Sequence, residues 1–137
     1  MTKVPNYWNK AKRHISKKDK IMGKLIKIYQ SPNETILTSR RDIFFSLCKS
    51  IIGQQISVAA ANSVFLKFKK KCNNKINAKK VSKLSFAQLK SCGLSRQKVL
   101  GIKSLAERVI DKSFNPKLIE KMTDEEAIEY LSNLRQI

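Results

Sequence analysis

Residues that interrupt helices are scarce in this sequence of 137 residues. It holds only 4 glycines and 3 prolines, and few β-branched residues alternate with polar ones as a strand would require. Apolar residues nevertheless make up 42% of the chain, which is enough to form a hydrophobic core. The composition therefore favours an all-α protein and argues against a disordered one.

Signals for disulfides, zinc and membrane spans are also missing. The three cysteines, Cys48, Cys72 and Cys92, are odd in number and show no Cys-x-x-Cys spacing, which argues against a disulfide framework and a structural zinc site. No apolar stretch approaches the ~20 residues of a membrane span, and the first residues contain no apolar signal segment. We expect a monomer in the cytoplasm, nucleoid-associated in a prokaryote, with no membrane partner and no bound metal.

Acidic residues are few and unevenly placed. The chain has 29 Lys and Arg against 10 Asp and Glu, giving a formal net charge of +19. Residues 1–105 carry 24 basic and 3 acidic side chains, whereas residues 106–137 carry 5 and 7. A polyanionic partner would relieve the self-repulsion of the first region and release counterions. A lysine-rich coding bias is the alternative, but such a bias would not spare the last thirty residues.

Apolar spacing and capping residues predict about six to seven helices. Asp19, Asp42, Ser57, Ser85 and Ser95 are suitable N-caps, and Thr123 with Glu126 matches a capping box. We expect a turn at 31–33, an irregular segment at 34–39 and a polar loop at 69–80. The expected helices span residues 5–16, 20–29, 43–52, 58–71, 86–91, 96–112 and 124 onward.

The last expected helix has an apolar face with no stop signal after it. The face consists of Ala127, Ile128, Leu131, Leu134 and Ile137. Because the pattern continues to the final residue, we expect residues 1–137 to form a single but incomplete domain.

Two segments carry a family resemblance. The first is 44–61, with an Ile-Gly-Gln-Gln-Ile-Ser run at 52–57, and the second is 89–106, which begins Leu-Lys-Ser-Cys-Gly-Leu-Ser-Arg-Gln-Lys. In this order and spacing they resemble the helix-hairpin-helix DNA glycosylases, most closely the alkylation-repair branch of the 3-methyladenine DNA glycosylase II type. The resemblance implies a helical array like the N-terminal and central part of these enzymes.

The resemblance also implies a site that binds and distorts DNA. Family members flip a damaged base out of the duplex and fill the vacated space with a side chain. That wedge corresponds to Gln55, and a second insertion corresponds to Leu94, which we expect to face solvent. The alternatives are an ordinary polar residue at a helix start for Gln55 and a buried contact for Leu94. The residues predicted for the wedge and for DNA binding are Gln54, Gln55, Ser57, Leu94, Ser95, Arg96 and Lys98.

The family's catalytic chemistry has no counterpart in this chain. The resemblance places the hairpin directly after Ile137 and the catalytic aspartate some twenty-five residues later. The internal carboxylates Asp19, Asp42 and Asp124 fit helix caps or first turns, and Glu107 with Asp111 fits an exposed helical pair. The lone His14 fits a half-exposed helix position. We therefore assign no catalytic residue and no cofactor, and expect the 137-residue chain alone to be inactive.

We therefore predict that this chain is part of a DNA repair enzyme. The intact parent is expected to hydrolyse the N-glycosidic bond of alkylated purines in damaged double-stranded DNA, with this chain supplying the wedge and the basic surface. A DNA-binding module without chemistry and a basic RNA-associated protein remain the alternatives.

Overall fold

The computed structural model describes residues 5–29 and 42–135. Within these ranges every regular element is a helix, which confirms the all-α prediction. The chain divides into two compact units, Met1–Arg40 and Arg41–Ile137, which we describe one at a time. The predicted turn at 31–33 and irregular segment at 34–39 lie outside the described residues. The prediction of one incomplete domain stays a prediction.

The first unit is a pair of packed helices, α1 (Trp8–Lys18) and α2 (Lys20–Tyr29). Asp19 separates them, and its carboxylate accepts hydrogen bonds from the backbone N–H groups of Ile21 and Met22, as expected of an N-cap. Gly23 lets the helices approach closely, because a Cβ there would lie 3.2 Å from the carbonyl oxygen of Ser16.

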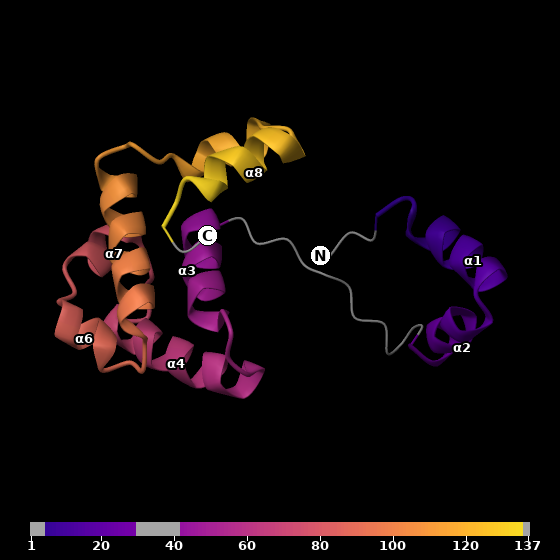
Figure 1. Ribbon diagram of the computed structural model, residues 1–137, viewed down its shortest axis with the longest axis horizontal. Coiled ribbons are helices and arrows are strands. Elements are labelled where there is room, and N and C mark those ends of the chain that lie inside the picture. The colour runs from indigo at the N-terminus through magenta and orange to yellow at the C-terminus, as the bar shows by residue number, and fades with distance from the viewer. Residues whose placement is uncertain (1–4, 30–41, 136–137) are drawn as a thin grey trace. The chain divides into compact units, whose positions relative to one another are not determined.

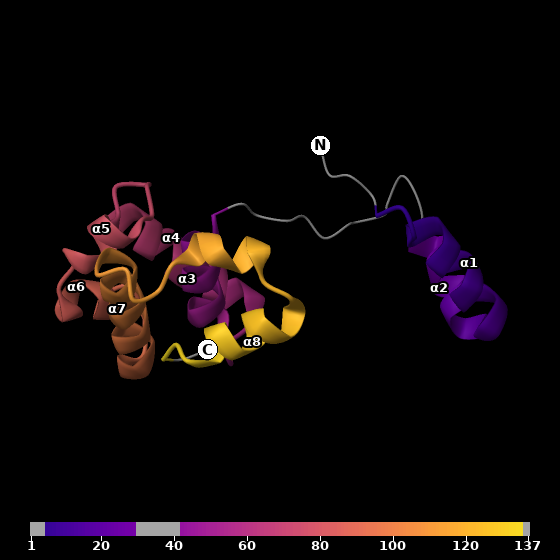
Figure 2. The same cartoon turned by 90° about the horizontal axis from the view of Figure 1, so that it is seen from above.

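The second unit contains the other helices of the described chain (Figures 1 and 2). In Figure 1, α4 and α6 lie at one end of this unit and α8 lies at the other. Its elements are α3 (Ile43–Gly53), α4 (Val58–Lys71), α5 (Ala78–Ser82), α6 (Phe86–Lys90), α7 (Arg96–Ile110), the 3₁₀ helix η1 (Pro116–Lys121) and α8 (Asp124–Ser132).

Polar side chains fix the helix starts of this unit where the sequence predicts them. Asp42, Ser57, Ser85 and Ser95 each accept a hydrogen bond from a backbone N–H in the first turn of α3, α4, α6 and α7. Thr123 forms the predicted capping box with Glu126. Each cap satisfies a backbone donor that has no partner inside its helix, so these residues determine where the helices begin.

The core of the second unit lies between α3 and α7. The inward faces of the two helices are almost fully buried, and Phe68 of α4 and Leu89 of α6 close one end. The buried residues of α3 and α7 are Cys48, Ile51, Ile52, Val99, Ile102, Leu105 and Ala106. All three cysteines are buried thiols. Burial raises the pKa of Cys48 well above its ordinary value and that of Cys72 to about 11, so both are neutral and unreactive at neutral pH.

Two sequence predictions about the helices of this unit are wrong, and one short helix lies where the sequence predicts none. The polar segment expected to be a loop ends in α5, because Asn77 caps a turn that buries Ala78 and Val81. Residues 116–121 form η1, with Pro116 in its first turn. The last helix ends at Ser132 rather than continuing, and Ile128, expected in the core, is 65% exposed.

Candidate nucleic-acid interface

The connection between α3 and α4, which we call the 54–57 loop, has a constrained backbone. Gln54 adopts φ −59° and ψ 130°, and Gln55 adopts φ +55°. This succession matches the central residues of a type II turn, where the second position normally needs glycine or asparagine. Gln55 is exposed. A long amide side chain therefore projects from a left-handed position that residues with a Cβ seldom occupy.

The end of the 54–57 loop forms the start of α4. The Ser57 hydroxyl accepts a hydrogen bond from the Ala60 N–H at 3.2 Å. Val58, Ala59 and Ala60 are all exposed. The helix dipole at this exposed first turn favours an anion such as a phosphate.

The connection between α6 and α7, the 93–95 loop, corrects the prediction for Leu94. Its side chain is only 2% exposed and belongs to the hydrophobic core. The expectation that Leu94 faces solvent is therefore wrong, and the buried-contact alternative describes its position. Ser95 caps α7 by accepting from the Lys98 N–H at 3.3 Å, and Arg96 is exposed beside it.

The Lys98 side chain links the start of α7 to the 54–57 loop, a contact that the sequence does not predict. Its ammonium donates hydrogen bonds to the carbonyl oxygens of Ile52 at 2.9 Å and Gln54 at 2.7 Å. The sequence predicts a DNA-binding side chain here, but the Lys98 side chain is half-buried and bonded within the protein. No local pattern could have indicated these bonds, because they link residues 46 and 44 positions apart.

Two further lysines are bonded in the same way. Lys80 donates to the carbonyl oxygen of Cys72 at 3.2 Å, and Lys103 donates to that of Leu84 at 2.9 Å. In a region with few carboxylates, main-chain carbonyls thus serve as partners for part-buried ammonium groups. Exposed cations such as Arg96, Lys70 and Lys71 provide the positive charge at the surface.

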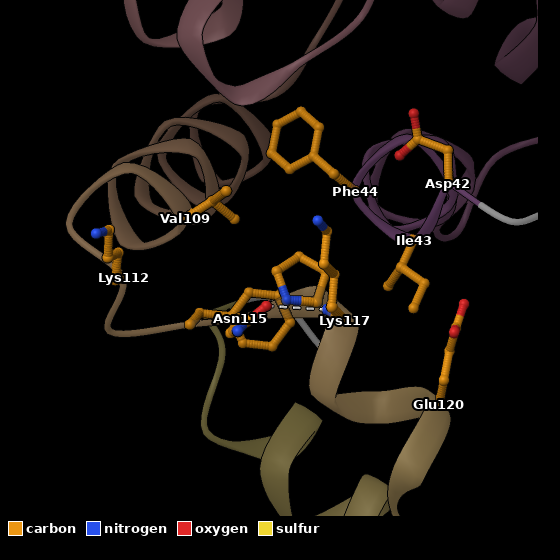
Figure 3. A pocket seen from close by; sticks show the side chains of 10 residues that line it. Asp42, Ile43, Phe44, Val109, Lys112, Asn115, Lys117 and Glu120 are labelled. Atoms are coloured by element: carbon orange, nitrogen blue, oxygen red, sulfur yellow. Dashed lines mark hydrogen bonds between the residues drawn. The ribbon is translucent and has the colours of Figure 1, made fainter.

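A pocket at the opposite end of α3 is an alternative candidate for an active site. It has a volume of about 570 Å³ and is lined by Asp42, Phe44, Val109, Lys117 and Glu120, among others (Figure 3). Asp42 caps α3, whose eleven residues put this pocket roughly 16 Å from the 54–57 loop. The Asp42 carboxylate accepts from the Phe45 N–H at 2.9 Å, as expected of a cap.

The Asp111 carboxylate, just after α7, also has a structural partner. Asp111 accepts a hydrogen bond from the Ser113 N–H at 2.8 Å, and hydrogen bonding from Ser113 lowers the pKa of its carboxyl group. Asp111 is exposed and ionised at neutral pH, and its lowered pKa has a local structural cause. In residues 5–29 and 42–135, no cluster of His, Cys, Asp or Glu can hold a metal, and no helix is long and apolar enough to cross a membrane.

Comparison with known proteins identifies relatives over nearly the whole chain. Residues 48–135 match the model of the HhH-GPD superfamily of base excision DNA repair proteins. DNA-3-methyladenine glycosylase 1 of Schizosaccharomyces pombe is 28% identical over 131 residues, covering 93% of this chain and 58% of that protein. The alkylbase DNA glycosidase-like protein mag2 of the same yeast is 28% identical over 141 residues, covering 100% and 65%. The chain thus spans about three-fifths of the length of these relatives.

Solved structures match as well. The S. pombe 3-methyladenine DNA glycosylase in complex with abasic DNA superposes with a TM-score of 0.82 at 27% identity, over 93% of this chain and 64% of that one. The DNA-3-methyladenine glycosidase of Bacillus halodurans shares the fold, with a TM-score of 0.70 at 23% identity over 90% and 56%.

Proposed function

Because the chain belongs to the HhH-GPD superfamily of base excision DNA repair proteins, we propose that it supplies the DNA-binding and wedge part of an alkyl-base DNA glycosylase. The enzyme hydrolyses the N-glycosidic bond of alkylated purines, of the 3-methyladenine type, after flipping the damaged base. The observation that carries this proposal is the exposed Gln55 side chain, held at a left-handed backbone position between two helices.

The geometry of the 54–57 loop suits base flipping. Removing a base from the stack costs a few kcal/mol, which a side chain entering the vacant space offsets in part. The flat amide of Gln55 can stack there and hydrogen-bond to the edge of the orphaned base. The first backbone N–H groups of α4 lie directly after this loop, where they can bind a neighbouring phosphate. Insertion and backbone binding are thus provided by one short segment.

The proposed chemistry is a substitution at C1′ of the flipped nucleotide. The bond from C1′ to the base nitrogen breaks, water adds its oxygen to C1′, and the base leaves with a proton. A carboxylate stabilises the positive charge that develops on the sugar. The family resemblance assigns that carboxylate to none of residues 1–137, and the described carboxylates Asp42 and Asp111 already have structural partners. We propose that the 137-residue chain alone does not release bases.

Binding and base-release assays on the same protein sample test this proposal. We expect the chain to bind duplex DNA with little sequence preference, with log K falling against log[salt] more steeply than a slope of about −2. We expect tighter binding to a duplex with an abasic-site analogue than to an intact one. A preference for structured RNA would favour the RNA-associated alternative, and equal binding to both duplexes would favour a module without a wedge.

The base-release assay uses alkylated DNA and a heat-inactivated sample as its control. Release by the 137-residue chain above that background would show that one of its own carboxylates is catalytic. Asp42 and the Glu107–Asp111 pair would then be the first residues to replace.

A further inference from the structure

We propose that Lys98 is a positioning residue that holds the 54–57 loop in the conformation that presents Gln55 to DNA. This inference rests on the proposed function of Gln55. In this proposal the Lys98 ammonium binds the protein's own main-chain carbonyls. It does not bind a DNA phosphate, which is what its place beside Ser95 and Arg96 would suggest. The start of α7 would thus help to position the wedge residue without itself entering the duplex.

The 54–57 loop has a backbone conformation that bonds from another element would stabilise. The positive φ of Gln55 is disfavoured for any residue with a Cβ, so the isolated turn would relax to other conformations. Nearby, the last carbonyl groups of α3 lack the N–H partner four residues on that a carbonyl in a helix interior has. The Gln54 N–H bond to the Ile51 carbonyl oxygen is long, at 3.4 Å. A bond of this length restrains the turn only weakly, so additional bonds to the same segment would strengthen its hold on Gln55.

Lys98 restrains the loop from a rigid element. Its ammonium bonds the Ile52 carbonyl before the turn and the Gln54 carbonyl within it, at 2.9 and 2.7 Å. These charge-assisted bonds fix the Ile52–Gly53 and Gln54–Gln55 peptide groups. Lys98 lies in the first turn of α7, which Ser95 caps and Val99 anchors in the core. One side chain thus transfers the rigidity of α7 to the peptide that precedes Gln55.

Lys103 provides a matched control on the same helix. Its ammonium also donates to a main-chain carbonyl, that of Leu84 at 2.9 Å, but this carbonyl lies before α6 and not in the 54–57 loop. Lys98→Met and Lys103→Met each remove one part-buried ammonium from α7 and keep the apolar stem. A general effect of weakening α7 should appear in both variants, whereas an effect on the position of Gln55 should appear only in Lys98→Met.

The first measurement uses the free protein. We expect ¹⁵N relaxation order parameters at Gln54, Gln55 and Ile56 to fall in Lys98→Met and to stay at wild-type values in Lys103→Met. Unchanged order parameters in Lys98→Met would overturn the proposal. If Lys98→Met does not fold, Lys98→Gln, which is uncharged and too short to span both carbonyls, replaces it in every measurement.

The second measurement compares binding to an abasic-analogue duplex and an intact duplex. We expect Lys98→Met to lower the preference for the abasic duplex by about tenfold, in the range expected when one stacked base contact is lost. Lys103→Met should keep the wild-type preference. The double variant Gln55→Ala/Lys98→Met should lose no more preference than Gln55→Ala alone, because both changes remove the same interaction.

The salt dependence separates this role from a phosphate contact. An ammonium that is bonded to carbonyls releases no counterion from DNA, so Lys98→Met should keep the wild-type slope of log K against log[salt]. A slope shallower by about one, with equal losses on both duplexes, would overturn the proposal and restore the phosphate contact. A wild-type protein that does not prefer abasic DNA would instead refute the proposed function, while the relaxation measurement would still decide whether Lys98 holds the loop.

Discussion

The 54–57 and 93–95 loops look alike in sequence but expose different kinds of residue. Each follows a glycine or contains one, and each ends in a serine that caps the next helix. In the first loop Gln55 is exposed, and Ile56 is 41% exposed. In the second loop Leu94 is 2% exposed. One loop therefore presents its central side chain to a partner, whereas the other directs its central side chain into the core.

The position of the left-handed residue explains the difference. In the 93–95 loop Gly93 itself takes the positive φ, of 96°, and lies against Val64 of α4, so the chain turns and Leu94 enters the core. In the 54–57 loop Gly53 is still helical and the positive φ falls two residues later, on Gln55. A glycine that absorbs the turn marks a structural loop. In the 54–57 loop a glutamine takes the left-handed conformation instead, and this disfavoured backbone is consistent with the functional role proposed for Gln55.

The largest effect expected from this comparison is on stability. Leu94→Ala should lower the free energy of unfolding by about 2–5 kcal/mol, because it leaves a cavity in the core. Ile56→Ala, an apolar truncation in the other loop, should cost less than about 1 kcal/mol, because Ile56 is partly in water already. Denaturant unfolding of both variants measures the contrast. If Leu94→Ala kept full stability and lost only abasic-duplex binding, Leu94 would be a second wedge.

The next effect concerns binding. Gln55→Ala should weaken binding to an abasic-analogue duplex by about 1–3 kcal/mol and leave binding to intact duplex nearly unchanged, because its stacking and base-edge contacts exist only when a base is displaced. Fluorescence anisotropy with both duplexes measures this difference.

Asn73→Ala is the matched control for Gln55→Ala. Asn73 is also an exposed amide side chain at a positive φ, of 51°, but it lies at the other end of α4. It should not alter the preference between the two duplexes. Equal losses on both duplexes for Gln55→Ala would show that the 54–57 loop only contacts the backbone.

Local signals were sufficient to predict most of the helices. Asp42, Ser57, Ser85, Ser95 and Thr123 each cap a helix within one turn, so the information lies in adjacent residues. The predictions failed where tertiary burial outweighed local polarity. The short helix α5 forms in a lysine-rich segment because its Ala78 and Val81 fit the core, which no pattern of this length can indicate.

The candidate site was predictable only in part. The exposure of Gln55 agrees with the prediction from the Ile-Gly-Gln-Gln-Ile-Ser run. Whether the Leu94 side chain points to solvent or to the core depends on which residue of its loop is left-handed, and the sequence does not indicate this. The role of Lys98 depends on contacts between helices far apart in sequence. A charged residue beside a helix cap has the same sequence signature whether it bonds a phosphate or a carbonyl.

The two glycines sharpen the comparison through a smaller effect on stability. Gly93→Ala should destabilise the fold by about 1–2 kcal/mol, because alanine is strained at a positive φ and its Cβ would lie 3.2 Å from the Val64 methyl group. Gly53→Ala should be neutral or stabilising by about 0.5 kcal/mol, because its Cβ would meet nothing nearer than Ala61 at 4.0 Å. Thermal unfolding of both variants decides the point, and a destabilising Gly53→Ala would refute the assignment of Gly53 to an unstrained helix end.

The smallest expected effect separates the two cations that follow the 93–95 loop. Arg96 is exposed, whereas the Lys98 ammonium is bonded to two carbonyls, so Arg96 is the better phosphate ligand. Arg96→Met should weaken binding to abasic and intact duplexes by the same few-fold factor, because a phosphate contact does not sense a missing base. It should also make the slope of log K against log[salt] shallower by about one, and leave the melting temperature of the protein unchanged.

Titrations of Arg96→Met at several salt concentrations, run beside Lys98→Met, measure the affinities and the salt slope. If Arg96→Met lowered the preference for abasic DNA as Lys98→Met is expected to, the 93–95 loop would take part in reading the lesion. Its difference from the 54–57 loop would then lie only in how it reaches the DNA.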